Sequence, residues 1–335
     1  MRAVIVGSGS EIPSKAVTNQ MLSRIMDTSD EWIRERSGVE TRYYVEPGTA
    51  TSDLGVAAAR RALESAGVEP AGVDLVVFAT MTPDHYFPGS GPLLQAKLGL
   101  RNVPCYDIRQ QCSGFVYGLQ MADAFIRSGM YKRILLIGAE LHSHALDFTT
   151  RGRDVMVLFG DGAGALVLGP METDDPRAGV MYTSVRADGN GVNDLNLKIF
   201  EIARMPYLDY DPKDREQNAI MYPKMDGKRV YLNAVRGMVM STNEALAKTG
   251  MTWDDIQWFV PHQANLRINE KVAEVAKIPH DKVLNTIEFY GNTTAATVPL
   301  TIDYWRQQGK VKRGDRILSS VFGSGFTWGA AIFTL

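Results

Sequence analysis

A cysteine occupies a chemically useful position in the stretch YDIRQQCSGFVYGLQ, residues 106–120. The apolar residues that follow it on one helical face are Phe115, Leu119, Ala122 and Ile126. This spacing predicts that Cys112 lies at the N-terminus of a helix that ends near Ser128. Backbone N–H groups and the helix dipole favour a thiolate there, so we expect a lowered thiol pKa and a nucleophilic sulfur. The alternative is a buried core cysteine, which is our interpretation of Cys105 in its apolar run.

Two side chains that suit a reactive thiol lie far along the chain. His262 follows the strand-like run IQWFV, and parallel α/β folds place their sites at such strand ends. Asn292 follows Gly291 and precedes the small residues that open the next helix. Taken singly, the histidine could be structural and the asparagine a turn residue. The three residues together predict a thiol-based catalytic site.

Strand-like and helical patterns alternate along the chain and predict the elements that position this site. In the first part, RAVIVGSG, DLVVFATM, VPCYDI, RILLIGAE and GALVLG read as strands between helical segments. A second series runs through GVMYTSVRADG, IQWFVPHQAN, KVLNTIEF, RILSSVFGSG and GAAIFTL. The alternation predicts an α/β fold in which helices cover mostly parallel sheets.

The order of elements repeats within the chain. DLVVFATMTPDH corresponds to DIQWFVPHQAN, and KRILLIGAE followed by GDGAGALVLG corresponds to DRILSSVFGSG followed by FTWGAAIFTL. We therefore predict two similar halves, residues 1–175 with the cysteine and residues 176–335 with the histidine and the asparagine. Packed together, they form a five-layered αβαβα pseudo-dimer.

A long segment at about 190–227 interrupts this repeat. It has prolines, many charges and no clear period, and loops of this length are usually functional caps or disordered connections. Its apolar residues, which favour a packed flap, are Phe200, Met205, Tyr207, Leu208 and Tyr210.

Composition excludes several classes of protein. The 335 residues carry 36 Lys and Arg against 38 Asp and Glu, so no general attraction to nucleic acid or to a membrane surface is expected. The 2 cysteines cannot form a disulfide framework, and with the 5 histidines they show no metal-ligand spacing. The apolar run at the N-terminus stops at Gly7, too early for a signal segment or a membrane span. A reduced, cytoplasmic setting is expected.

Several motifs, in order along the chain, resemble β-ketoacyl-acyl-carrier-protein synthase III, a thiolase-fold family. They are DTSDEWI, CSGF, FGDGAGA, VPHQANLRI, GNTTAA and GSGFTWGAA. The resemblance implies a homodimer that accepts an acyl group from acyl-CoA and condenses it with malonyl-acyl-carrier-protein, or malonyl-CoA, with loss of CO2. It implies no metal and no cofactor, because acyl-CoA is a substrate.

The resemblance also implies roles for the three site residues. Cys112 carries the acyl group as a thioester, which divides a difficult condensation into two easier steps. His262, as a neutral imidazole, and the Asn292 amide donate hydrogen bonds to the enolate that forms when CO2 is lost. The backbone N–H groups of Cys112 and Ser324 are expected to bind the acyl oxyanion.

Binding residues follow from the same family positions. Coenzyme A carries phosphates and adenine, which suit arginine and an aromatic face. The CoA-binding positions are Trp32, Arg36, Arg151 and Asn265. Arg267 and Lys271 match the approach of the acidic carrier protein, and Phe87 matches the residue that closes the primer pocket from the partner subunit. Packed or solvated surface side chains remain the alternative for these positions.

The chain departs from the primary-metabolism pattern around the thiol. Arg109, Gln110 and Gln111 stand where small residues are common, and Lys228 stands where an asparagine is frequent. The runs DIRQQCSGFVYGLQMA and TRYYVEPG look more like the branch that makes quinolone signals and other specialised ketides, with a longer or non-acetyl primer. That branch is the alternative function.

Three further classes remain open. A thioesterase or papain-like protease also uses Cys, His and Asn, and the separation of Cys112 and His262 falls in the range of about 130–150 residues, but the family signature is absent. A nucleotide-binding dehydrogenase is suggested by VIVGSGSEIP, which lacks the third glycine of the fingerprint. A non-catalytic acyl-CoA-binding protein of the same fold would bind acyl-CoA without releasing CO2.

Overall fold

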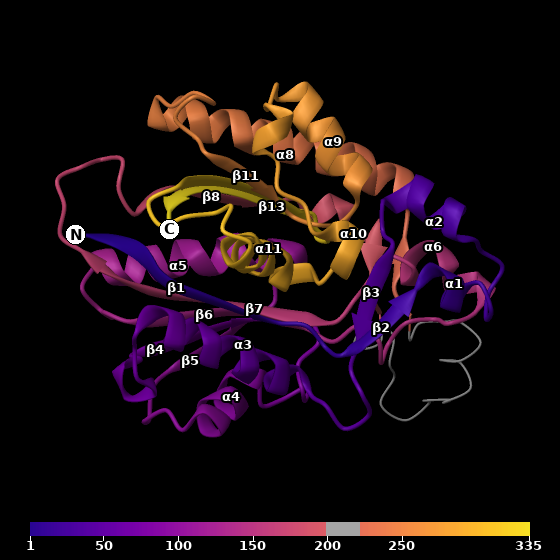
Figure 1. The fold of residues 1–335 in the computed structure, drawn as a ribbon, viewed down its shortest axis with the longest axis horizontal. Helices are drawn as coiled ribbons and strands as arrows, with labels where there is room; N and C mark the ends of the chain where they lie inside the picture. Colours follow the sequence, from indigo (N-terminus) through magenta and orange to yellow (C-terminus); the bar gives the residue numbers. More distant parts are fainter. Residues whose placement is uncertain (199–221) are drawn as a thin grey trace.

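The computed structural model describes residues 1–198 and 222–335, which form five layers (Figure 1). Two central sheets lie face to face, with helices α5 (Gly114–Arg127) and α11 (Thr297–Gln307) between them. Helices α3 (Thr51–Ala66) and α4 (Ser90–Leu98) cover the outside of the first sheet. Helices α8 (Gly227–Thr249) and α9 (Leu266–Val275) cover the outside of the second. The α/β fold and its αβαβα layering are those that the sequence predicted.

The first sheet has five strands in the order β1-β7-β6-β4-β5. Their bounds are Arg2–Glu11 for β1, Gly162–Met171 for β7, Ile134–Glu140 for β6, Leu75–Ala79 for β4 and Cys105–Ile108 for β5. Only the β6, β4 and β5 pairs are parallel, whereas β7 pairs antiparallel with both of its neighbours. Strand β5 lies at an edge.

The second sheet has four strands in the order β11-β12-β13-β8. Their bounds are Trp258–Pro261, Arg316–Gly323, Thr327–Thr334 and Val180–Ala187, respectively. Only the β11 and β12 pair is parallel. The prediction of mostly parallel sheets is therefore wrong, because the connection between β12 and β13 is a tight turn, which can only join antiparallel strands.

Another sequence interpretation also changes. The run KVLNTIEF was read as a strand, but its residues form a 3-10 turn (His280–Lys282), an isolated bridge at Val283 and helix α10 (Ile287–Tyr290). The predicted division into residues 1–175 and 176–335 falls in the turn between β7 and β8 and stays a prediction.

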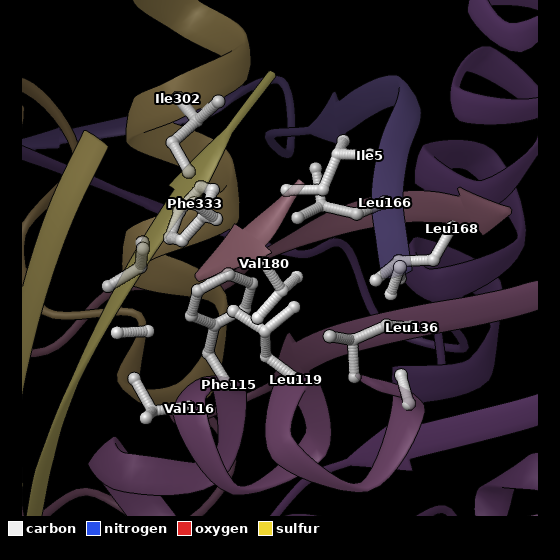
Figure 2. Packing of buried hydrophobic residues seen from close by; sticks show 14 of the residues in the cluster. Ile5, Phe115, Val116, Leu119, Leu136, Leu166, Leu168, Val180, Ile302 and Phe333 are labelled. Carbon is white, nitrogen blue, oxygen red and sulfur yellow. The ribbon is translucent and has the colours of Figure 1, made fainter. Parts of the chain in front are cut away.

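The core that joins the layers lies between the two sheets, where α5 packs on both (Figure 2). Phe115 and Leu119 of α5 meet Phe333 from the second sheet and Leu136 from the first. All four are at most 1% exposed, and burying each side chain contributes about 1.5–3 kcal/mol. This packing fixes the start of α5, and with it the cysteine, between the sheets.

Gly7 and Gly9 of β1 explain the VIVGSGSEIP motif without a nucleotide. A Cβ at Gly7 would lie 2.5 Å from the Ala62 carbonyl oxygen, and one at Gly9 would lie 2.4 Å from that of Ala58. The two glycines therefore allow α3 to pack directly on β1. The motif lies inside one strand rather than in a strand-to-helix turn, so the dehydrogenase interpretation is wrong.

A smaller unit completes one end of the molecule. Strands β2 (Lys15–Thr18) and β3 (Thr41–Tyr44) pair beside helices α1 (Asn19–Leu22), α2 (Asp30–Ser37) and α6 (Arg153–Met156) (Figure 1). The segment predicted as a flap at 190–227 contributes the paired strands β9 (Leu195–Asn196) and β10 (Lys224–Met225). Residues 199–221, including the aromatic residues that suggested a packed flap, lie outside the described residues.

Candidate active site

Cys112 lies between β5 and α5, as predicted, in the 3-10 turn Gln111–Ser113 directly ahead of the helix. Its predecessor Gln111 has a φ of 43°, in the left-handed region that few non-glycine residues adopt. Such strain is held in place by surrounding structure and is frequent at functional sites. The cysteine side chain is 8% exposed and borders two cavities.

The expected lowering of the Cys112 pKa is wrong for the free chain. Burial raises the pKa of the thiol to about 12, and the nearby Glu140 carboxylate acts in the same direction. Hydrogen bonds from the backbone and from Thr294 lower it by less. The position of Cys112 relative to α5 was predictable from the sequence, but its depth of burial was not, and burial outweighs the effect of the helix terminus on the pKa. Cys105 is only half buried, at the start of edge strand β5.

His262 follows β11 directly, at the strand end where it was predicted. Its backbone N–H donates to the Ser320 carbonyl at 2.9 Å, and its Nδ1 lies 2.7 Å from the Thr297 hydroxyl. Burial lowers the pKa of the imidazole to about 3, so the ring is neutral at physiological pH. Its Nε2 is buried and has no partner among the described residues.

Asn292 is fixed by its backbone and by its side chain. Its N–H donates to the Leu158 carbonyl at 2.7 Å, and its carbonyl accepts from Gly160 N–H at 3.1 Å. Its Oδ1 accepts from the Thr294 N–H at 2.8 Å. With the oxygen engaged, the amide N–H2 is the group left to donate into the cavity that Asn292 lines.

A cavity of about 490 Å³ brings the three residues together. The predicted residues that line it are Cys112, His262, Asn292, Trp32, Arg36, Asn265 and Arg267. Arg151, Lys271, Phe87 and Ser324 are not among its lining residues. The three chemical groups therefore share one space with several of the predicted binding residues.

The turn after β12 lies against the cysteine. A Cβ at Gly323 would lie 3.0 Å from the Cys112 Cβ and 3.1 Å from its backbone nitrogen, which is tighter than most Cβ contacts, so glycine eases this approach. Ser324 lines a second, smaller cavity of about 70 Å³, which Cys112 also borders. The two backbone groups predicted to bind the oxyanion are thus neighbours.

Trp32 is contacted by two arginines, of which the sequence identified one. Arg36 lies 4.7 Å and Arg153 5.0 Å from the ring, both at cation–π distance. Arg151 instead pairs with Asp147 at 2.6 Å and stands 5.4 Å from the Tyr222 ring. The RGRD motif holds two candidate arginines, and only the fold distinguishes them.

Asn265 connects two helices, and the charged residues that follow it differ in where they lie. The Asn265 amide donates to the Arg36 carbonyl at 2.9 Å, and its oxygen caps α9 by accepting from Arg267 N–H, also at 2.9 Å. It therefore fastens α9 to α2. Arg267 is exposed at the cavity, whereas Lys271 pairs with Glu274 at 2.9 Å on the outside of α9.

Phe87 lies in a loop outside both cavities and is 81% exposed. Lys228, which the sequence marked only as a departure from the family pattern, lines the large cavity.

Four residues of the site were not predicted from the sequence: Arg153, Thr297, His142 and Thr294. The last two line the small cavity with Cys112, and the histidine after a buried strand was an available signal.

Within residues 1–198 and 222–335, no cluster of three or more His, Cys, Asp or Glu side chains has the arrangement of a metal site. In the same described part of the chain, no helix combines the length and hydropathy needed to cross a bilayer.

The layered fold, with these three residues on one cavity, defines the thiolase-fold class. Residues 106–189 match the family described as 3-Oxoacyl-[acyl-carrier-protein (ACP)] synthase III, and residues 246–335 match its C-terminal region. A β-ketoacyl-[acyl-carrier-protein] synthase III of Hyphomonas neptunium is 41% identical over 335 residues, covering 100% of this chain and 99% of that protein. The chain belongs to the β-ketoacyl-acyl-carrier-protein synthase III family and is an acyltransferase of the condensing type.

Solved structures agree with this assignment. The synthase III of Aquifex aeolicus superposes with a TM-score of 0.89 at 37% identity, covering 99% of this chain and 100% of that one. The priming β-ketosynthase of the R1128 polyketide pathway gives 0.90 at 34% identity, covering 99% and 96%. The full-length relatives favour the synthase III reaction over the specialised-ketide alternative, and the protease interpretation is wrong.

Proposed function

We propose that this chain transfers an acyl group from acyl-CoA to Cys112 and condenses it with a malonyl thioester on acyl carrier protein or CoA. The observation that carries this proposal is the convergence of Cys112, neutral His262 and Asn292 on one cavity. No carboxylate base and no cofactor is needed, because loss of CO2 itself generates the carbon nucleophile.

In the first step, Cys112 Sγ bonds to the thioester carbonyl carbon and the bond from that carbon to the CoA sulfur breaks. The proton of the cysteine leaves with CoA, which departs as a thiol. Negative charge develops on the carbonyl oxygen, for which the backbone N–H groups of Cys112 and Ser324 are the proposed donors. The close approach of Gly323 to Cys112 supports this role.

In the second step, the malonyl carboxylate leaves as CO2 and an enolate forms. His262 Nε2 and the Asn292 amide are the proposed donors to the enolate oxygen. The enolate carbon bonds to the acyl carbon, the bond to Sγ breaks, and the cysteine thiolate takes a proton from solvent. The lowered pKa of His262 supports this role, because it makes the ring a neutral imidazole, the form expected to donate one N–H hydrogen bond to the enolate.

Donation from Nε2 requires that Nε2 carries the ring proton. The Thr297 hydroxyl has one proton and two acceptors within reach, His262 Nδ1 at 2.7 Å and the Thr294 carbonyl at 3.0 Å. We propose that Thr297 donates to Nδ1, the shorter of its two contacts, which places the ring proton on Nε2. We therefore assign Thr297 as the residue that sets the tautomer of His262.

Cationic side chains at the large cavity suit a phosphorylated substrate. Arg36, Lys228 and Arg267 are exposed there, and none has a carboxylate partner within residues 1–198 and 222–335. Unpaired cations of this kind bind phosphate. We propose that they take the phosphates of CoA, with Trp32 and Arg153 against adenine, and that Arg267 and Lys271 meet the carrier protein.

A homodimer completes the proposal. Among the residues that the structure describes, strand β5 is a sheet edge with unpaired backbone groups. Its Tyr106 is 39% exposed and stacks on Phe125 with ring centroids 5.7 Å apart. Exposed Phe87 is proposed to enter the primer pocket of a second copy. The bacterial relatives and the free thiols support a cytoplasmic setting.

Mass spectrometry of the intact protein tests the central step. After incubation with acyl-CoA, the chain should gain the mass of one acyl group on the peptide that contains Cys112, and Cys112→Ala should gain none. Cys105→Ala, the matched control, should be acylated normally. Acylation of Cys105 alone, or none in the unmodified chain, would overturn the proposal.

The proposed contact of Trp32 and Arg153 with adenine has a separate test. Arg153→Ala removes the arginine that we place against adenine, and a cation–π contact of that kind is worth about 0.5–1 kcal/mol, so the KM for acyl-CoA should rise about twofold to fivefold. The same arginine-to-alanine change at Arg151 should have a smaller effect. A larger KM increase for Arg151→Ala would assign adenine to that residue instead.

A further inference from the structure

A second buried imidazole stands beside the thiol, and the proposed reaction does not use it. His142 follows β6 and lines the small cavity with Cys112 and Thr294. Its Nε2 lies 2.7 Å from the Thr294 hydroxyl oxygen. Both side chains are buried, at 5% and 0% exposure.

The position of the His142 ring is fixed on two sides. The His142 backbone N–H donates to Asp161 Oδ1 at 2.7 Å, and the ring lies 4.6 Å from the Phe159 ring between centroids. Burial lowers the pKa of the imidazole to about 3, with His144 adding to the effect, so the ring is neutral. A neutral imidazole carries one proton, on either nitrogen.

The backbone at Thr294 is strained in a way that serves its side chain. Its φ is 51°, in a region that β-branched residues rarely adopt. The bond from Thr294 N–H to Asn292 Oδ1 at 2.8 Å holds this conformation. Thr294 borders the same small cavity as Cys112, and hydrogen bonding by its hydroxyl lowers the pKa of the thiol.

The direction of these two bonds follows from counting protons. A hydroxyl has a single proton, so a threonine that donates to sulfur must accept from its other neighbour. Here the other neighbour is His142, which therefore carries its proton on Nε2. The result is a chain of donors, Nε2–H to Oγ1–H to Sγ, in which each bond polarises the next.

We propose that His142 is a positioning residue that acts through Thr294 to stabilise the anionic sulfur of Cys112 during acyl transfer. This role rests on the proposed function of Cys112 as the acyl carrier. No proton is transferred between His142, Thr294 and Cys112, so His142 stays neutral throughout the reaction.

Other ionisable groups also lie near Cys112 and His142. Glu140, at the end of β6, raises the pKa of the thiol, and its own pKa is raised by burial to about 8. Asp161 accepts from the backbone of His142, and neutral His262 borders Cys112 across the large cavity. The donor chain opposes burial and Glu140, which both favour the neutral thiol.

The test measures the rate at which iodoacetamide alkylates Cys112 in the full chain, as a function of pH and without acyl-CoA. Thr294→Val keeps the branched shape but removes the hydroxyl, and His142→Leu removes the ring donor. If the thiol pKa rises by one unit, the fraction of Cys112 present as thiolate falls tenfold. The nucleophilicity of that thiolate rises by a smaller factor. We therefore expect alkylation about threefold to fourfold slower in both variants below the thiol pKa. Thr294→Ser and His142→Gln keep a donor and should restore the rate.

Two controls distinguish this role from a general loss of structure. Thr249→Val deletes a hydroxyl that donates to the Ala245 carbonyl within α8, and it should leave Cys112 alkylation unchanged. Alkylation of Cys105 should be the same in all variants. Superimposable pH profiles for Thr294→Val, His142→Leu and the unmodified chain would overturn the donor chain. If Cys112 of the unmodified chain is not alkylated at any pH, the proposed function fails first.

Discussion

Two buried histidines line the two cavities that Cys112 borders, one in each, and they differ in which ring nitrogen has a hydrogen-bond partner among the described residues. Burial lowers the pKa of both to about 3. Each lies 2.7 Å from a threonine hydroxyl, and both threonines come from the short segment that starts α11. His262 bonds through Nδ1 and leaves Nε2 free toward the large cavity, whereas His142 bonds through Nε2.

The difference shows how one kind of side chain can take two roles. A free, protonated Nε2 can donate to a substrate, so His262 suits the enolate. The Nε2 of His142 lies against the Thr294 hydroxyl and can act only through it, so His142 is suited to stabilising the Cys112 sulfur. The segment from Asn292 to Thr297 supplies the asparagine and both threonines, which couples the two sides of the site.

The largest expected effect separates the two histidines by reaction step. His262→Ala should slow CO2 release from a malonyl thioester by about 10²-fold or more, because a donor to the enolate is lost. His142→Leu should leave this step nearly unchanged in enzyme that is already acylated. Release of CO2 from pre-acylated protein is the measurement, and equal losses in the two variants would break the distinction.

The two threonines should separate in the same way, with smaller effects. Thr297→Val leaves His262 Nδ1 without its donor and favours the tautomer with a bare Nε2. CO2 release should fall about tenfold, as expected for one hydrogen bond, and Thr297→Ser should recover it. Thr294→Val should spare CO2 release from the acylated enzyme. A Thr297→Val enzyme with normal decarboxylation would contradict the tautomer assignment.

Protein stability at acid pH tests whether both rings are neutral. The unfolded chain protonates these histidines near pH 6.5, but the folded chain does so only near 3. The unfolded state therefore binds more protons in this window, and the free energy of unfolding should fall as pH drops from 6.5 toward 3. Urea unfolding at a series of pH values should show a shallower decline in His142→Leu. The exposed control His280→Gln should retain the full decline.

Glu140, as a single group, should give an effect of opposite sign. Burial raises its pKa from 4.5 to about 8, so the folded chain keeps a proton that the unfolded chain releases. Its contribution to stability is present below pH 4.5 and is lost as pH rises through 8. Glu140→Gln should remove this dependence in urea unfolding, whereas exposed Glu270→Gln should not. A steeper loss in Glu140→Gln would show that the carboxyl is ionised in the folded chain.

Local pattern was enough to predict much of the fold and the positions of the three central residues. The apolar spacing after Cys112 predicted α5, whose last residue is Arg127, and the run before His262 predicted β11. Strand direction was not predictable in this way, because pairing depends on which distant strand lies alongside. The run KVLNTIEF failed for a related reason, since its apolar residues pack as a turn and a short helix.

The chemical state of the site was less accessible from the sequence. A helix start suggested an acidic thiol, but burial and Glu140 reverse the direction, and both effects depend on distant parts of the chain. Arg151 and Arg153 are chemically identical, and only the fold shows which one contacts Trp32. Thr294 attracts no attention in GNTTAA, because its strained backbone and its contact with His142 exist only in the folded protein.

The sequence by itself determined which residue types were present, the elements that precede and follow them, and the family to which their motifs are similar. These properties depend on side-chain chemistry and on short-range periodicity, which every segment carries within itself. The tertiary structure alone decided the burial, the protonation states and the hydrogen-bond directions around Cys112. These depend on the local dielectric environment and on which polar groups meet across more than a hundred residues of chain, as His142 and Thr294 do.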